Sequence, residues 1–174
     1  MRLCFEDLPV GTRFESQPIA VSLEEIVRFA SDFDPQPFHL DDALARETFF
    51  GGIAASGWHT TALTMRLMVA TLPIEGGVIG AGADELRWPN ALRPGDEIRV
   101  RAEVIEAREL KSRKDRGLVR FRVETLNQRD QPVQVMVPNL FVPLRAALAT
   151  PASRRSHAAS SAASRSALNP AFHA

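Results

Sequence analysis

The stretch from Gly57 to Leu72 is apolar on almost every side, and Arg66 is its one strongly basic residue. A helix without a polar face is a buried one, so this stretch predicts a helix of about 24 Å at the centre of the fold. Ser56 is placed to cap its first turn, and Pro73 ends it. The rest of the chain therefore has to wrap around this helix.

The second half of the chain alternates between apolar and polar side chains. EIRVRAEV at positions 97–104 has one apolar and one charged face, and LVRFRVET at 118–125 repeats the pattern. This period of two predicts strands with one buried face. GGVIGAGADELRW at 76–88 and PVQVMVPNLFV at 132–142 add two strands, and Pro138 indicates an edge or a bulge. The expected fold is α+β, an antiparallel sheet wrapped round a long central helix, which is the hotdog arrangement.

A short helix from Leu23 to Ser31 precedes these elements, because Ser22 and Glu25 have the spacing of a capping box. Pro35 ends this helix, since proline lacks a backbone donor and pushes the residue before it towards extended dihedral angles. We therefore expect the segment from Asp34 to His39 to be a stiff loop without helical structure.

A second short helix is expected over DDALARETFF at positions 41–50. The carboxylate of Asp41 or of Asp42 is the N-cap acceptor, and the pair Gly51 and Gly52 ends the helix.

The chain is expected to hold one hotdog domain over residues 1–148, with a tail over residues 149–174. The tail consists mainly of alanine, serine and arginine and has few large apolar side chains. Such a segment cannot offset its ordering entropy by burial, which predicts a flexible tail. An amphipathic segment that binds a partner is the alternative.

Charge and composition exclude several partners. The chain has 21 basic and 21 acidic residues, and Arg154, Arg155 and Arg165 leave residues 1–148 with a small excess of acid. Such a body has no general attraction for nucleic acid or an anionic membrane. No stretch approaches the ~20 apolar residues of a membrane span, and the N-terminus lacks the apolar run of a signal peptide. With Cys4 as the only cysteine, we expect a cytoplasmic protein without an intrachain disulfide.

Two motifs resemble a known family. DPQPFHLD from Asp34 to Asp41 and FGGIAASGWH from Phe50 to His59 are similar to the motifs of MaoC-like acyl dehydratases, which are relatives of the (R)-specific enoyl-CoA hydratases. The resemblance continues through LRWPNALRPGDEI and covers roughly the first 145 residues. It implies a lyase that hydrates a trans-2-enoyl-CoA to an (R)-3-hydroxyacyl-CoA, or catalyses the reverse dehydration.

The family pattern falls on Asp34, Pro37, His39 and Gly57 of this chain. The chain departs from it at Gln36, where many relatives have asparagine, and at Ser56, where the better-studied hydratases have histidine. These departures leave the chemistry open to argument and bear most on the choice of substrate.

Hydration of an enoyl thioester requires a base for the water, a proton source for the α-carbon and a group that stabilises negative charge on the thioester oxygen. Asp34 and His39 are the candidates for the first two, with Asp34 favoured as proton acceptor. His39 would orient the water and return a proton, and sequence leaves the division between them open. Gly57 offers a backbone N–H at the positive end of the central helix, and its lack of a side chain would let the oxygen approach.

The resemblance implies a coenzyme A thioester as substrate and no further cofactor. We expect Pro37, Phe38, Ser56 and Trp58 to contact this substrate. His59 is expected to pack on the helix. HLD at positions 39–41 is weak metal spacing, and no other histidine or cysteine is placed to complete a zinc site, so no metal is expected.

Two other functions stay open. A hotdog thioesterase would cleave the thioester with a carboxylate and water, and a non-catalytic hotdog would only bind acyl-CoA. The histidine five residues after the aspartate favours the hydratase. An unpaired strand edge invites pairing, and related hotdogs join two sheets, so we expect a homodimer or a higher assembly of dimers.

Overall fold

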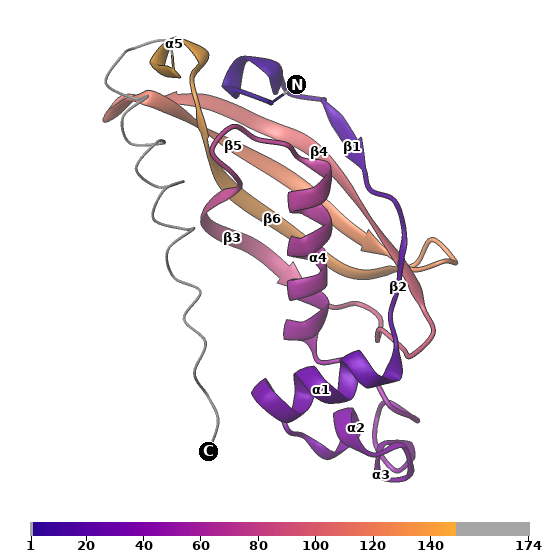
Figure 1. Ribbon diagram of the computed structural model, residues 1–174. Coiled ribbons are helices and arrows are strands. Elements are labelled where there is room, and N and C mark those ends of the chain that lie inside the picture. Colours follow the sequence, from indigo (N-terminus) through magenta and orange to yellow (C-terminus); the bar gives the residue numbers. More distant parts are fainter. Residues whose placement is uncertain (1, 149–174) are drawn as a thin grey trace, which may run out of the picture.

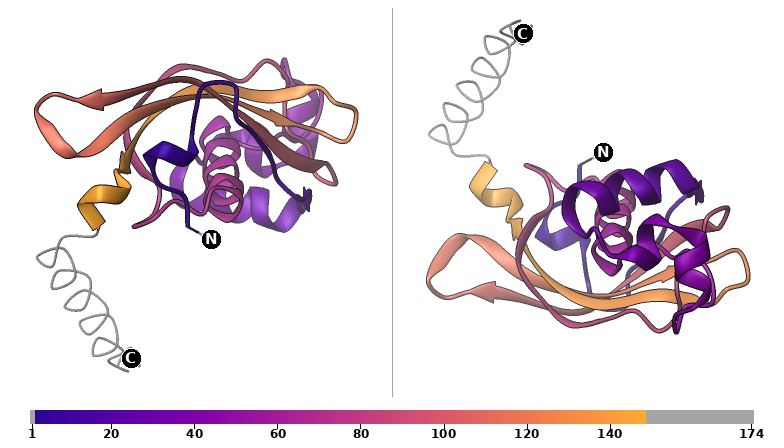
Figure 2. Two further views of the ribbon diagram at one scale, coloured as in Figure 1. Left: turned by 90° about the horizontal axis from the view of Figure 1, so that it is seen from above. Right: turned by 90° about the horizontal axis from the view of Figure 1, so that it is seen from below.

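The computed structural model describes residues 2–148, and the predicted tail at 149–174 lies outside these described residues. Within them, a six-stranded antiparallel sheet curves around one long helix, α4 (Gly57–Thr71) (Figure 1). The helices lie against one face of the sheet and leave the other face uncovered (Figure 2). This confirms the predicted hotdog arrangement.

The sheet has the strand order β1-β4-β5-β6-β3, with β2 paired to β4 beside β1. The long strands run antiparallel to their neighbours, and β3 forms one edge. The strand bounds are β1 (Arg13–Glu15), β2 (Ile19–Ala20), β3 (Ile79–Arg87), β4 (Glu97–Leu110), β5 (Arg113–Leu126) and β6 (Pro132–Pro143).

Pro138 lies in β6, which is an inner strand between β5 and β3. The alternative that placed this strand at an edge is therefore wrong. The other alternative, a bulge, agrees with the pairing of β6 and β3, whose register shifts on both sides of the β3 pair Ala83 and Asp84, where Ala83 faces Pro138. A strand opposite a proline loses one ladder hydrogen bond, which fits the irregular pairing there.

Helix α1 (Leu23–Phe33) begins with the predicted capping box. The Ser22 hydroxyl accepts the backbone N–H of Glu25 at 3.1 Å, and the Glu25 carboxylate accepts the backbone N–H of Ser22 at 3.1 Å. The helix ends two residues later than predicted, at Phe33, with Asp34 as its C-cap.

The expectation of a loop without helical structure from Asp34 to His39 is wrong in part. Helix α2 (Pro37–Leu40) is a short helix that begins with Pro37. Proline fits the first position of a helix, because its φ is helical and its missing N–H would have no partner there. Two nearby prolines therefore act differently, since Pro35 ends one helix and Pro37 begins the next.

Helix α3 (Asp42–Arg46) is shorter than the predicted segment at 41–50. Its N-cap is Asp41, whose carboxylate accepts the backbone N–H of Leu44 at 3.0 Å. The remaining short elements are η1 (Phe5–Asp7) and α5 (Arg145–Leu148). None of the helices of the described chain is both long and apolar enough to cross a membrane.

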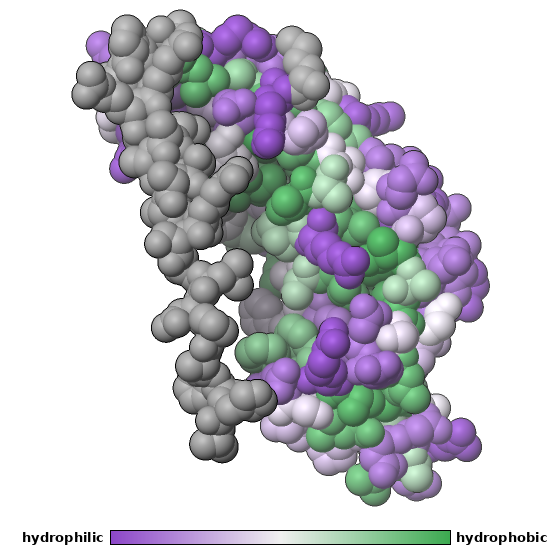
Figure 3. Space-filling view, viewed as in Figure 1, coloured by the Kyte–Doolittle hydropathy of each residue, from purple (hydrophilic) through white to green (hydrophobic). Residues whose placement is uncertain are grey.

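Helix α4 packs its inner face against the sheet, through buried side chains that include Leu63, Leu67 and Met68. Its outer face is open, with Trp58, Met65 and Val69 60%, 40% and 54% exposed. On the face of the molecule that carries α4, hydrophobic surface lies among hydrophilic patches (Figure 3). The prediction that α4 is buried on all sides is therefore wrong for this single chain.

Candidate active site

A cavity of about 690 Å³ lies where the N-terminus of α4 meets α1, α2 and the segment that follows β3. Figure 1 shows α1, α2 and α3 gathered at this end of α4. The cavity is lined by Asp34, Gln36, Phe38, His39, Phe49, Phe50, Ala55, Ser56, Gly57, Trp58, Thr60, Trp88, Pro89, Asn90, Ala91, Leu92 and Arg93. The three residues predicted to act in catalysis, Asp34, His39 and Gly57, all line it.

Asp34 ends α1 and accepts hydrogen bonds on both carboxylate oxygens. Its Oδ2 accepts the Ser56 hydroxyl at 2.6 Å, and its Oδ1 accepts Nε2–H of Gln36 at 2.7 Å. The Ser56 hydrogen bond is the largest cause that lowers the pKa of Asp34 below its ordinary value, against a desolvation effect that raises it. Asp34 is therefore held ionised and oriented, as a proton acceptor requires.

The buried imidazole of His39 has its two nitrogens in different surroundings. Nδ1 lies 2.7 Å from the carbonyl oxygen of Ala54, and a carbonyl only accepts, so Nδ1 carries a proton that it donates there. Nε2 lies 3.4 Å from Oδ2 of Asp34. Two atoms at this separation can both lie within ~2.8 Å of a single water to one side of the line that joins them.

Gly57 is the first residue of α4, and its backbone N–H has no acceptor among residues 2–148. The neighbouring residue, Ser56, caps the helix by accepting the N–H of Trp58 at 3.2 Å while it donates to Asp34. The Ser56 hydroxyl therefore hydrogen-bonds both the Asp34 carboxylate and the N-terminus of α4, which is the positive end of the helix dipole. The free N–H of Gly57 lies at the same helix end.

The structure gives Gly57 a reason to lack a side chain beyond the one expected. A Cβ at this position would lie 2.8 Å from ring carbons of Trp88, a distance too short for a real contact. The indole ring thus occupies the space that a side chain at position 57 would take. Glycine is needed here because Trp88 packs directly on the first turn of α4.

The other predicted contact residues have different positions. Phe38 and Trp58 line the cavity, and the Phe38 ring lies edge-on to His39 with ring centroids 4.5 Å apart. Ser56 also lines it but is fully buried, and its hydroxyl is committed to Asp34 and to the helix cap. Pro37 is not among the lining residues, and its place is the start of α2.

Sequence reasoning missed three residues, of which Trp88 and Arg93 line the cavity and Gln134 supports Trp88. Trp88 donates its Nε1–H to the side chain of Gln134 at 3.0 Å, and Gln134 is fully buried in β6. A polar residue at an inward position of a strand was the available signal for Gln134. Trp88 and Arg93 lie in LRWPNALRPGDEI, which resembles the family, but no local pattern indicated their contacts, because their partners are 40 or more residues away.

His59 packs as predicted. It is 5% exposed, and its ring stacks on Phe29 of α1 with centroids 4.7 Å apart and an angle of 10°. Burial lowers the pKa of His59 below its ordinary value. Its ring therefore acts as a neutral contact between α1 and α4.

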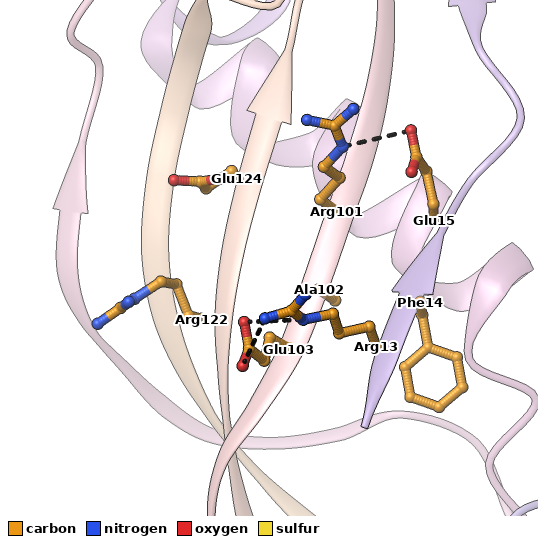
Figure 4. Close-up of a pocket in the computed structure, with 8 residues that line it drawn as sticks. All are labelled: Arg13, Phe14, Glu15, Arg101, Ala102, Glu103, Arg122 and Glu124. Atoms are coloured by element: carbon orange, nitrogen blue, oxygen red, sulfur yellow. Dashed lines mark hydrogen bonds and ion pairs between the residues drawn. The ribbon is translucent and has the colours of Figure 1, made fainter. Parts of the chain in front are cut away.

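A second hollow, of about 500 Å³, lies on the face of the sheet that α4 leaves uncovered (Figure 4). Arg13 and Glu103 pair across it at 3.3 Å, and Arg101 pairs with Glu15 at 3.4 Å. These charges neutralise one another at the surface, which is typical of a solvated sheet face. Among the described residues, no three histidine, cysteine or acidic side chains gather to hold a metal ion.

Comparisons with known proteins agree on one family. Residues 6–126 match the family described as MaoC like domain. The 3-hydroxybutyryl-CoA dehydratase of Methylorubrum extorquens is 35% identical over 105 residues, which are 60% of this chain and 65% of that protein. The uncharacterized protein YdeM of Bacillus subtilis is 29% identical over 129 residues, 74% of this chain and 90% of the relative.

Solved structures show the same relationship. The MaoC-like dehydratase from Rhodospirillum rubrum superposes with a TM-score of 0.80 and 51% identity, over 82% of this chain and 98% of that one. The R-hydratase PhaJ1 from Pseudomonas aeruginosa superposes with a TM-score of 0.68 and 27% identity, over 83% and 88% of the two chains.

Proposed function

The chain belongs to the MaoC-like domain family, and we propose that it is an acyl-thioester hydratase in which Asp34 and His39 activate one water. The reaction is the addition of water to a trans-2-enoyl-CoA to give an (R)-3-hydroxyacyl-CoA, or the reverse dehydration. The observation that carries the proposal is the 3.4 Å separation of Asp34 Oδ2 and His39 Nε2 in the cavity that Gly57 also lines.

In the proposed reaction the water oxygen bonds to C3 of the enoyl group while Asp34 takes a proton from the water. The electrons of the double bond move towards the thioester, and its oxygen gains negative charge. The N–H of Gly57 at the start of α4 stabilises this charge, because the N–H and the helix dipole both favour an anion there. The proton that Asp34 has taken passes to Nε2 of His39, 3.4 Å away, and from Nε2 to C2, so both side chains return to their starting forms.

The hydrogen bonds at the site support this division of roles. Asp34 accepts from Ser56 and Gln36, which favours its ionised form and therefore its use as the base. His39 has its Nδ1–H fixed on Ala54, so Nε2 is the nitrogen that gains and loses a proton. The two groups thus have separate tasks on one water.

Coenzyme A is the proposed carrier of the acyl group, and no further cofactor is required by this reaction. The relative from Methylorubrum extorquens is a 3-hydroxybutyryl-CoA dehydratase, which supports an acyl-CoA substrate. Aromatic side chains, among them Phe38 and Trp58, supply apolar walls for the acyl group.

We further propose that the protein acts as a homodimer. The edge strand β3 is exposed along nearly its whole length, and α4 leaves Trp58, Met65 and Val69 open. A two-fold axis perpendicular to the sheet would pair two β3 edges antiparallel and bring both α4 helices to the same face. The mouth of the cavity, next to Trp58, would then lie near the second subunit.

The test is a panel of trans-2-enoyl-CoA thioesters of different chain lengths given to the wild-type protein. Loss of the absorbance of the conjugated double bond and release of free thiol are followed in parallel. The proposal expects loss of conjugation without thiol release. Release of thiol without hydration would contradict the hydratase and indicate a thioesterase. If no thioester in the panel is either hydrated or cleaved, the protein is a non-catalytic acyl-CoA-binding protein.

A further inference from the structure

Three backbone carbonyl groups between α3 and α4 converge on one guanidinium group. Nη1 of Arg93 donates to the carbonyl oxygens of Gly52 and Ile53 at 2.7 and 3.0 Å, and Nη2 donates to the carbonyl oxygen of Phe50. Among residues 2–148, no carboxylate lies within ion-pair distance of this guanidinium. Arg93 is therefore a cation whose partners are main-chain atoms.

The convergence depends on the two glycines of this segment. Gly51 has φ 61° and Gly52 has φ 150°, values that other residues rarely adopt. In a strand, successive carbonyls point in opposite directions, so three carbonyls out of four consecutive residues cannot meet one cation. The glycine pair turns the backbone so that the three carbonyl groups point to one place. The planar guanidinium of Arg93 has N–H donors in the directions needed to bind all three.

The segment is held on its other side as well. Oδ1 of Asp42 accepts the backbone N–H of Ile53 at 3.1 Å, and the carbonyl of Leu92 accepts the N–H of Ala55 at 2.8 Å. Leu92 and Arg93 are adjacent, so the contact to Ala55 and the contacts to the three carbonyl groups start from neighbouring residues before β4. Together they fix the backbone on either side of Ala54.

The carbonyl of Ala54 is the group that receives Nδ1–H of His39 at 2.7 Å. Its direction decides which ring nitrogen of His39 carries the fixed proton and where Nε2 points. A rotation of this peptide would leave Nδ1–H without its acceptor, and the imidazole would turn or change tautomer. The position of Nε2 beside Asp34 thus depends on the backbone on either side of Ala54, which Arg93 holds at the Gly52 and Ile53 carbonyls and Leu92 holds at the Ala55 N–H.

From these contacts we propose that Arg93 is a positioning residue for His39, acting through the carbonyl groups of the 50–53 segment and the carbonyl of Ala54. The inference rests on the proposed function in so far as His39 acts on the water. Arg93 also lines the cavity, so the competing role is direct contact with a phosphate group of coenzyme A. Three of the five N–H groups of its guanidinium are already committed to the backbone, which favours the positioning role.

The experiment compares Arg93→Ala, Arg93→Lys and the wild type on two substrates, crotonyl-CoA and the crotonyl thioester of N-acetylcysteamine, which has no phosphate. A misplaced catalytic group costs about 10²-fold in rate. We expect Arg93→Ala to lose about this factor in kcat on both substrates, with little change in KM. Arg93→Lys keeps the positive charge but lacks the planar set of guanidinium donors, so its loss in kcat should lie between those of the wild type and Arg93→Ala.

Arg13→Ala is the matched control, because Arg13 is an exposed arginine of β1 that pairs with Glu103 at 3.3 Å on the uncovered face of the sheet. It should keep kcat near that of the wild type. Added guanidinium ion should restore part of the lost rate to Arg93→Ala and none to an Asp34→Asn variant, since only the first lacks a guanidinium.

A second readout does not depend on turnover. The ¹⁵N NMR spectrum of the His39 ring should show the Nδ1–H form in the neutral wild-type ring and a mixture of tautomers in Arg93→Ala and Arg93→Lys. This readout separates the two proposals, because it tests Arg93 even if no enoyl thioester is hydrated. An unchanged tautomer in both variants, or a rise in KM for crotonyl-CoA alone, would overturn the positioning role.

Discussion

Gly57 and Trp88 form a contact at the residue scale that requires the absence of a side chain. A Cβ at position 57 would lie 2.8 Å from the indole ring of Trp88, and a hydrogen bond from the indole Nε1–H to Gln134 holds that ring in place. Gly57→Ala should therefore destabilise the fold by about 1–3 kcal/mol, as overpacking does. Urea unfolding measures this loss.

The second half of the same prediction uses Trp88→Ala as background. With the indole removed, the added methyl group at position 57 has no clash, so Gly57→Ala should cost much less stability there. An equal loss in both backgrounds would show that the glycine is needed for another reason.

The hydrogen bond from Ser56 to Asp34 predicts a shift in the pH dependence of hydration. It lowers the pKa of Asp34, so the base stays ionised to a lower pH, and activity is lost only as the pH falls through that lowered value. Ser56→Ala should raise the pKa of Asp34 and move the acidic limb of kcat/KM to higher pH. Ser56→Thr keeps the hydroxyl and should leave the limb in place.

The measurement is kcat/KM for crotonyl-CoA against pH for the three proteins. An acidic limb at the same pH in Ser56→Ala and in the wild type would contradict the assignment of Asp34 as the base. The two positions where the chain departs from the family pattern, Gln36 and Ser56, are both donors to this carboxylate, so they bear on its basicity.

The site residues differ in how well sequence could reveal them. Asp34, His39 and Gly57 lie in short motifs, and the structure brings them to one cavity. Arg93 and Trp88 bind partners far along the chain, and the direction of a side chain after a strand depends on tertiary packing. No local pattern encodes such contacts.

Local capping rules predicted the helix starts well at the scale of elements, because a cap is a contact within three residues. Ser22 and Asp41 both act as N-caps in the structure. The exception is α2, where a proline read as a helix breaker is the first residue of a helix. Proline is disfavoured in the interior of a helix but is well tolerated in its first turn.

The contact between α1 and α4 predicts how stability changes with pH. His59 stacks on Phe29, and burial is the main cause of its lowered pKa, with Arg28 adding to the shift and Glu25 opposing it. The unfolded chain therefore binds more protons at this site below about pH 6.5, and the folded state loses stability as the pH falls from there towards the lowered pKa.

His59→Phe keeps an aromatic ring against Phe29 and removes the titrating group. Its free energy of unfolding should fall less between pH 7 and pH 5 than that of the wild type. Denaturant unfolding at both pH values gives the comparison. Parallel losses in the two proteins would mean that His59 is not a buried neutral ring.

The exposed face of α4 gives a prediction at the scale of the whole molecule. Apolar side chains on a central helix are expected to be covered, and in this chain Met65 and Val69 are 40% and 54% exposed. A homodimer should therefore be found at micromolar concentration by analytical ultracentrifugation, and Val69→Lys should weaken it. Val10→Lys, at an apolar position that is 64% exposed far from α4 in the chain, is the control.

A monomeric wild type at that concentration would contradict the dimer.

The sequence predicted the layers of the fold because periods of two and of 3.6 report burial directly. The prediction that α4 is buried on all sides was wrong for its outer face. An apolar residue gives the same sequence pattern whether its own chain or a second chain covers it.

The central claim is that Asp34 and His39 act together on one water, and turnover of crotonyl-CoA by Asp34→Asn, His39→Gln and the double variant tests it most directly. Each single variant removes one general acid–base group and should lose about 10²–10⁴-fold in kcat while circular dichroism shows an intact fold. Because the two groups form a unit, the double variant should lose much less than the product of the single losses. Near wild-type hydration by Asp34→Asn, or losses that multiply fully in the double variant, would contradict the account.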